Sequence, residues 1–131
     1  MTVEKTTPET ILKLQFETDA GMGSRANIGM IVLSSDQTLE LEFRTLLDFE
    51  GVALYHARIP NEMEITEGTL AQMEAELPIT ASLLPASFNF DVIGYGCTSG
   101  TTVIGEGRVA KAIRTAPVSY THLTLPTTPY V

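Results

Sequence analysis

The chain has 131 residues, enough for one compact domain and too few for two. Its hydrophobic content of 44% and charged content of 18% are those of a globular protein and argue against a disordered chain. The net charge of −8, from scattered acidic residues, argues against the clustered Lys and Arg surface of a nucleic-acid-binding protein. No apolar run approaches the roughly 20 residues that cross a bilayer, and the N-terminus does not resemble a signal peptide. We therefore expect a cytoplasmic protein with no membrane or nucleic-acid partner.

The first part of the chain predicts one strand and one helix after a polar extension. Residues 1–24 form this N-terminal extension, in which residues 12–16 alternate between apolar and polar as a short edge strand would. The apolar run 27–33 predicts a strand buried on both faces, and residues 34–38 end it with turn-forming and helix-capping side chains. Residues 39–48 then predict a helix with one apolar face and an acidic first turn.

The same alternation continues twice more. Residues 52–59 predict a second strand, and residues 66–84 predict a longer helix with a kink at Pro78. Residues 90–95 predict the third strand, and residues 103–114 can continue as a helix.

The order β-α-β-α-β-α over residues 25–116 indicates an α/β fold with a doubly wound parallel sheet and right-handed crossovers. In proteins with a parallel sheet, helices cover both faces, and the sheet usually has more than three strands. We therefore expect part of a larger flavodoxin-like domain, with the strand order 2-1-3.

The C-terminal segment, residues 117–131, does not fit this pattern. It contains three prolines and no charged residue other than His122. One interpretation is a fourth strand from Val118 to Leu125. The other is a non-native tail that resembles a translated cloning or sequencing-adapter sequence and has to be set aside before the fold is assigned. We favour the non-native tail.

Two loops rich in hydroxyl groups follow the first and third predicted strands, at residues 34–38 and 96–101. With the order 2-1-3, the carboxyl ends of these strands lie side by side, where ligands bind open α/β sheets. Each loop also leads into a helix whose first N–H groups point outward. The two loops together predict a cradle for a small carboxylate.

Cys97 is the single cysteine of the chain, and with two distant histidines it makes neither a disulfide framework nor a closed zinc site. It follows the third strand at the approach to a helix N-terminus, where the dipole and backbone donors stabilise a thiolate. A thiolate can attack an activated double bond or abstract an acidic α-proton. An inert buried thiol is the alternative, and by position the two are equally well supported. Gly96 and Gly100, which let the backbone approach a ligand closely, favour a functional thiol.

Several polar residues near Cys97 each have two interpretations. Asp36 is a second acid–base group facing the thiol or the N-cap of the first helix, which is the commoner role. Thr98 and Ser99 bind a substrate carboxylate or cap their own helix. Arg58 ends the second strand near the same edge, as part of the site or of a surface ion pair.

Residues 28–40 (IGMIVLSSDQTLE) and 91–101 (DVIGYGCTSGT) resemble the maleate cis-trans isomerase and arylmalonate decarboxylase branch of the aspartate/glutamate racemase superfamily. Residues 52–60 (VALYHARIP) resemble the same branch, especially the racemase-like proteins of ectoine utilisation. The resemblance covers about residues 25–114. It implies the N-terminal half of a racemase-type fold, with the active site between two similar halves and no metal or organic cofactor.

The resemblance also implies roles for individual residues. In the racemases and isomerases each half supplies one cysteine, and Cys97 matches the first-half cysteine, which attacks the alkene in maleate isomerases. Asp36 matches a position that is Asn in those isomerases and Asp in other members, and this departure argues against maleate itself as the substrate. Thr38, Thr98 and Ser99 match carboxylate-binding positions.

We therefore expect the parent protein to be a cofactor-independent isomerase or racemase that acts on a small carboxylate or dicarboxylate through the thiolate of Cys97. Ser35, from the hydroxyl-rich loop after the first strand, is expected to join the substrate-binding residues. An arylmalonate-decarboxylase-like lyase and a non-catalytic carboxylate-binding domain are the alternatives. Characterised decarboxylases keep their cysteine in the second half, which favours an isomerase. Without the second half we expect the chain to have little activity. The sequence is compatible with a homo-oligomer and does not determine the oligomeric state.

Overall fold

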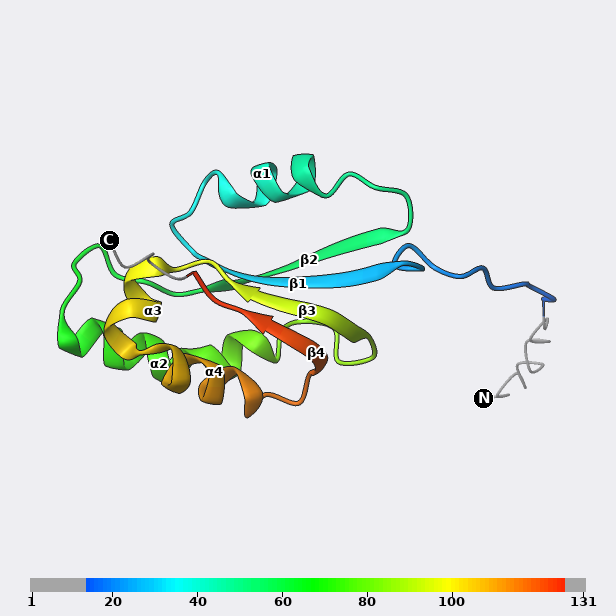
Figure 1. Ribbon diagram of the computed structural model, residues 1–131. Helices are drawn as coiled ribbons and strands as arrows, with labels where there is room; N and C mark the ends of the chain where they lie inside the picture. The colour runs from blue at the N-terminus through cyan, green and yellow to red at the C-terminus, as the bar shows by residue number, and fades with distance from the viewer. Residues whose placement is uncertain (1–13, 127–131) are drawn as a thin grey trace, which may run out of the picture.

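The computed structural model describes residues 14–126, which form an α/β fold (Figure 1). The elements, in chain order, are β1 (Ala26–Leu33), α1 (Leu39–Leu46), β2 (Val52–Ile59), α2 (Glu67–Ala81), β3 (Asn89–Tyr95), α3 (Thr98–Ile104), α4 (Glu106–Arg114) and β4 (Ser119–Thr124). The alternation of strands and helices over residues 25–116 is as the sequence predicts.

The strands form one parallel sheet with the order β2-β1-β3-β4. In the register, Ile31 of β1 lies between Ala57 of β2 and Tyr95 of β3. The predicted order 2-1-3 is therefore confirmed. The carboxyl ends of β1 and β3 are neighbours, which brings the loops after these strands to the same edge of the sheet.

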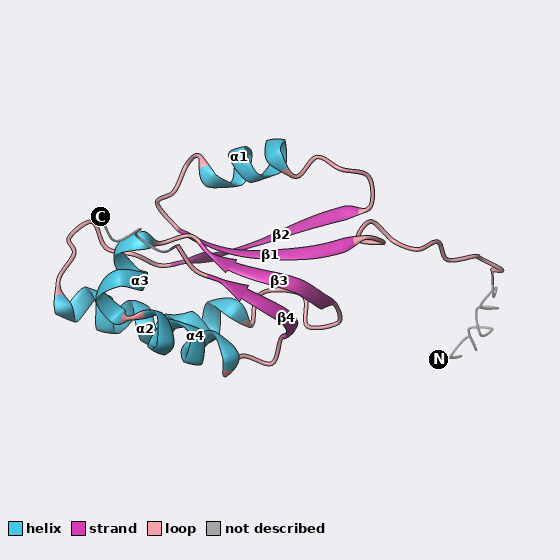
Figure 2. Cartoon of the chain, viewed as in Figure 1, coloured by secondary structure: helices cyan, strands magenta, loops and turns pink. Residues whose placement is uncertain are grey.

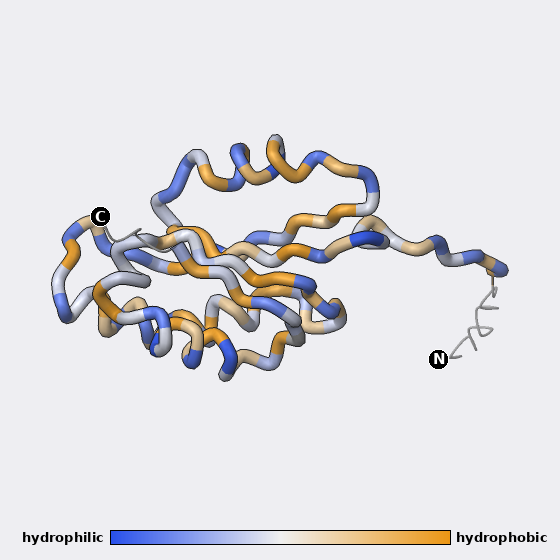
Figure 3. Tube along the Cα trace, in the orientation of Figure 1, coloured by the Kyte–Doolittle hydropathy of each residue, from blue (hydrophilic) through white to orange (hydrophobic). Residues whose placement is uncertain are grey.

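Helices lie on both faces of the sheet, as a doubly wound fold requires (Figure 2). α1 lies alone on one face, and α2, α3 and α4 cover the other. The hydrophobic core lies under these three helices, where Ile31, Leu77 and Val109 are fully buried. Figure 3 shows that hydrophobic residues gather along the strands, in agreement with a sheet buried between helices.

The two predicted helices on this face differ in detail from the structure. α2 continues through Pro78 and ends at Ala81, so Leu83 lies outside the helix and is 67% exposed rather than part of the apolar stripe. The last predicted helix, residues 103–114, corresponds to α4 and the end of α3, and the sequence did not predict that α3 begins at Thr98. Gly105, with a φ of 96°, ends α3 and separates it from α4. This left-handed backbone is accessible to glycine at low cost.

The predicted edge strand before β1 is wrong for the residues that the structure describes. Residues 14–18 have no regular secondary structure, and Leu14 and Phe16 are 80% and 83% exposed. A segment of alternating apolar and polar residues forms a strand only where a neighbouring strand offers hydrogen-bond partners, and no strand pairs with residues 14–18. Leu12 lies outside the described residues.

The segment after residue 116 adopts the conformation of the less favoured interpretation. Ser119–Thr124 form β4, which pairs in parallel with β3 and places Leu123 opposite Ile93. The strand fits imperfectly, because the Tyr120 hydroxyl oxygen is buried without a hydrogen-bond partner. Whether residues 117–131 are encoded by the natural gene does not follow from their conformation. Their non-native origin therefore stays a prediction. Residues 127–131 lie outside the described part.

Candidate active site

A cavity of about 210 Å³ opens at the carboxyl ends of β1, β2 and β3, on the side of the sheet that α2 covers. Its lining residues are Leu33, Ser35, Asn61, Glu62, Met63, Glu64, Ile65, Thr69, Leu70, Met73, Cys97 and Ser99. The cavity thus brings Cys97 together with one hydroxyl from the loop after β1 and one from the first turn of α3.

Cys97 is the N-cap residue of α3. Its Sγ accepts a hydrogen bond from the backbone N–H of Gly100 at 3.3 Å and lies 3.7 Å from the Oγ of Ser99. The side chain is 5% exposed, so it is buried against the core and still forms part of the cavity wall. The backbone N–H of Gly100 is thus directed at the sulfur, which is the atom through which a reactive cysteine acts.

Asn61 links the loops after β1 and β2 and was not anticipated from the sequence. Its Oδ1 accepts hydrogen bonds from Ser34 Oγ at 3.0 Å and from the Ser35 backbone N–H at 3.1 Å. Its Nδ2 donates to Ser35 Oγ at 2.9 Å. Its position in the sequence could have identified it, because Asn61 follows Pro60 directly after β2. β2 ends at the same edge of the sheet as β1 and β3.

Asp36 caps the start of α1 through its side chain, although Thr38 and not Asp36 occupies the N-cap position. Its Oδ1 accepts hydrogen bonds from the backbone N–H groups of Leu39 at 2.7 Å and Thr38 at 2.9 Å. These two bonds, and then the charge of Arg58, hold the pKa of Asp36 below its ordinary value. The carboxylate does not line the cavity of Cys97. The structure therefore shows the capping role, and the catalytic role stays a prediction.

Thr38 and Thr98 also lie away from this cavity. Thr38 is the N-cap residue of α1, is exposed, and makes no capping bond through its side chain. Thr98 lines a different cavity, which Leu39 and Phe43 of α1 border on the other face of the sheet. Successive helix residues point about 100° apart, so Thr98 and Ser99 face different sides of α3. Of the predicted carboxylate-binding residues, the cavity contains Ser35 and Ser99.

Arg58 has a structural role. Its Nη1 donates hydrogen bonds to the backbone oxygens of Leu33 at 3.2 Å, Ser34 at 3.1 Å and Asp36 at 2.9 Å. Its Nη2 forms an ion pair with Glu40 at 2.8 Å. The guanidinium therefore ties β2 to the loop after β1 and fixes the position of the loop that carries Ser35.

The charge in the candidate site is negative. Glu62 and Glu64 line the cavity, and none of its lining residues is a Lys, Arg or His. An anion in this cavity would be held by hydroxyl, amide and backbone donors. Within residues 14–126 no three His, Cys, Asp or Glu side chains come close enough to hold a metal ion, and no helix is long and apolar enough to cross a membrane.

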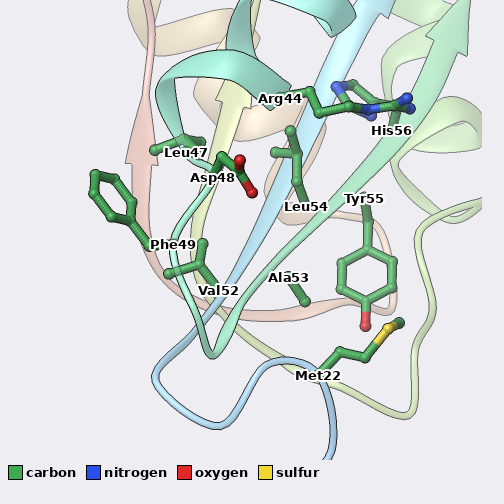
Figure 4. Close-up of a pocket in the computed structure, with 10 residues that line it drawn as sticks. All are labelled: Met22, Arg44, Leu47, Asp48, Phe49, Val52, Ala53, Leu54, Tyr55 and His56. Carbon is green, nitrogen blue, oxygen red and sulfur yellow. The ribbon is translucent and has the colours of Figure 1, made fainter.

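A second cavity, of about 280 Å³, lies under the C-terminal end of α1 (Figure 4). Its lining includes Arg44 and Asp48 from α1 and the following loop, and His56 from β2. Burial lowers the pKa of His56, and its Nε2 is buried without a hydrogen-bond partner. The cavity also touches Val52, the first residue of β2. It therefore reaches the amino end of the strand, away from Cys97.

No family model and no curated protein matches the chain. Among solved structures, the chain is similar to a cysteine-to-alanine variant of the maleate isomerase from Pseudomonas putida S16, crystallised with maleate. The TM-score is 0.50 at 23% sequence identity, over 72% of this chain and 44% of that chain. The chain thus spans less than half of the length of that enzyme. At this identity the similarity shows the fold: the chain folds like one half of a maleate isomerase.

Proposed function

We propose that the parent protein is a cofactor-independent isomerase or racemase that acts on a small carboxylate through the thiolate of Cys97. The observation that carries the proposal is the hydrogen bond from the Gly100 N–H to Cys97 Sγ, in a cavity that also holds Ser35 and Ser99. A thiol that were simply a core residue would need neither a backbone donor nor a polar cavity beside it.

The hydroxyl groups of the cavity are available for a substrate carboxylate. Ser35 Oγ accepts its hydrogen bond from Asn61, so its own proton is free to be donated to a ligand. Ser99 Oγ lies beside the sulfur and can donate to a group bound there. These donors would orient a carboxylate next to Cys97 without a side-chain cation.

Two reactions fit such an arrangement. In an isomerisation, the thiolate adds to the double bond of an unsaturated dicarboxylate and forms a C–S bond, while the electron pair moves into the adjacent carboxylate. The former double bond rotates as a single bond, and elimination restores the alkene and the thiolate. In a racemisation, the thiolate instead removes an α-proton, and a second acid returns it to the other face.

We propose that the second wall of the site, with a second cysteine, comes from the remainder of the parent protein. The solved isomerase of similar fold is more than twice as long as the matched part, and the cavity described here has an acidic rim and no cation. Asp36, Thr38 and Thr98 flank the same edge of the sheet, so they would contact substrate only with that second half in place. The 131-residue chain alone is expected to show no turnover above background.

Sequencing the gene past codon 116 tests the missing half directly. We expect the residues after 116 to differ from the tail described here and to lead to a second cysteine in a Gly- and Thr-rich strand end. A gene that reads through residues 117–131 as printed and then stops would contradict both the non-native tail and the two-halved site.

The catalytic role is tested by Cys97→Ser and Cys97→Ala in the full-length parent, with Leu46→Ala on the exposed side of α1 as the control. Turnover of maleate and related dicarboxylates is followed by NMR, and α-proton exchange of amino and hydroxy acids is followed in D₂O. Both cysteine variants should lose at least about 1,000-fold in kcat, and the control should lose nothing. Unchanged turnover would exclude the thiol from catalysis.

The same assays separate the two alternative functions. Carboxylate binding without turnover of any substrate would favour a binding domain, and CO₂ release from an arylmalonate would favour a lyase.

A further inference from the structure

Three side chains meet around Gly100, next to the candidate nucleophile. A Cβ atom placed on Gly100 would lie 2.6 Å from Tyr95 Oη, 3.1 Å from Cys97 Sγ and 3.3 Å from Met73 Sδ. Tyr95 and Met73 are 2% and 7% exposed, so their side chains are fixed by the core. The absence of a side chain at Gly100 is what allows the three groups to approach one another.

The Tyr95 hydroxyl is hydrogen-bonded to one sulfur atom and lies near a second, that of Cys97. It donates a hydrogen bond to Met73 Sδ at 2.9 Å, and a thioether is a weak acceptor. Burial raises the pKa of Tyr95 far above its usual value, and the charge of the neighbouring Cys97 raises it further. The hydroxyl therefore keeps its proton, and it can act as a donor whenever Cys97 ionises.

A thiolate is a much stronger acceptor than a thioether, because a hydrogen bond to a charged group is about twice as strong as one between neutral groups. Ionisation of Cys97 would thus draw the hydroxyl away from Met73. We propose that Tyr95 is a positioning residue for Cys97, whose hydroxyl moves from Met73 Sδ to Cys97 Sγ and, with the Gly100 N–H, holds the thiolate in place. This inference rests on the proposed role of Cys97, but its test reads the thiol itself.

Alkylation of the 131-residue chain by iodoacetamide between pH 5 and 10 tests the proposal, because Cys97 is the single cysteine. The rate follows the thiolate fraction. Tyr95→Phe removes the donor, so the midpoint should move up in pH, and the rate at pH 7 should fall about 3- to 10-fold. Met73→Leu removes the competing acceptor at nearly constant volume, so the midpoint should move down and the rate should rise. A general loosening of the core would move the rate in the same direction in both variants.

The other titratable groups that line the cavity are Glu62 and Glu64, from the segment between β2 and α2. They are unchanged in both variants, so their effect cancels in the comparison. Equal midpoints for Tyr95→Phe and wild type would overturn the proposal. If Tyr95→Phe does not fold, as judged by circular dichroism, an unchanged midpoint in Met73→Leu overturns it instead. Suppose that the alkylation midpoints of the two variants shift in opposite directions, but the full-length parent turns over no substrate. That result would support the movement of the Tyr95 hydroxyl and contradict the enzymatic role, so the two proposals can be told apart.

Discussion

The two faces of the sheet are built very differently. On the face that α2, α3 and α4 cover, Leu77, Val109 and Ile93 are completely buried. On the opposite face, α1 has no buried residue, and cavities of about 280 and 320 Å³ lie between it and the strands. One eight-residue helix covers only part of a four-stranded sheet. The first face therefore has a continuous core, whereas the second is buried only locally, at residues such as Met30 and Val32.

This difference also divides the predicted site residues. Cys97 and Ser99 line the cavity on the face that α2 covers, where Met73 and Tyr95 fix the surroundings of the sulfur. Thr98 lines the cavity on the α1 face instead. Packing holds reactive groups in position most effectively, and the thiol is on the side with the more extensive core. Four predictions test how far the two faces differ, from the largest expected effect to the smallest.

Leu77→Ala and Leu46→Ala compare the faces directly. Leu77 is fully buried in α2, whereas Leu46 of α1 is 68% exposed. Removing the buried side chain leaves a cavity and should lower the free energy of unfolding by about 2–5 kcal/mol. The exposed change should cost less than about 0.5 kcal/mol. Urea denaturation measures both, and similar losses would show that α1 is packed as tightly as α2.

Gly100→Ala and Gly96→Ala test how each face accommodates one methyl group. The Cβ at Gly100 would lie 2.6 Å from the fixed Tyr95 hydroxyl, so we expect a loss of about 1–3 kcal/mol and altered reactivity of Cys97. The Cβ at Gly96 would meet the flexible end of Leu39 on α1, which can move away, and the loss should be under about 1 kcal/mol. Thermal unfolding of the two variants gives the comparison, and a larger loss for Gly96→Ala would reverse it.

Asp36→Ala should destabilise the α1 side by about 0.5–2 kcal/mol, because the carboxylate caps the first turn. The pKa of Asp36 in the folded protein lies below the ordinary value of 3.8, so its stabilisation is complete above that pH. It is lost as the pH falls through the lower folded-state pKa. Urea unfolding at pH 7 and pH 3 should therefore show a difference between variant and wild type that shrinks in acid.

The matched control is Thr38→Ala, at an N-cap position whose side chain makes no capping bond. It should cost less than about 0.5 kcal/mol at either pH. A loss equal to that of Asp36→Ala would mean that Thr38 is the effective cap.

Gly107→Ala carries the smallest expected effect. Gly107 lies near the start of α4, and a Cβ there would meet nothing within 4 Å. Alanine should stabilise the helix by a few tenths to about 1 kcal/mol, measured as a rise in the urea midpoint. At Gly105, where φ is 96°, the same substitution should be destabilising. A loss at Gly107 would mean that this position needs glycine for a reason other than space.

Much of the fold was predictable because hydrophobic period and capping chemistry are local properties of the chain. The apolar run that became β1 and the helix-forming pattern that became α1 and α2 lie where they were expected. Alternation of strand and helix then implied parallel strands, and the order 2-1-3 followed. The wrong edge strand at residues 14–16 shows the limit, since alternation cannot reveal whether a hydrogen-bond partner is present.

The candidate site was predictable only in part. The sequence by itself determined that Cys97 follows a strand and lies on the approach to a helix, because the strand end and the glycine-rich turn are encoded locally. Only the tertiary structure decided which polar groups share its cavity, since the rotation of each helix about its axis depends on what it packs against. That rotation selects Ser99 over Thr98, while the pairing of β2 with β1 brings in Asn61. The core on the α2 side likewise places Tyr95 against Met73 and leaves α1 with an open face.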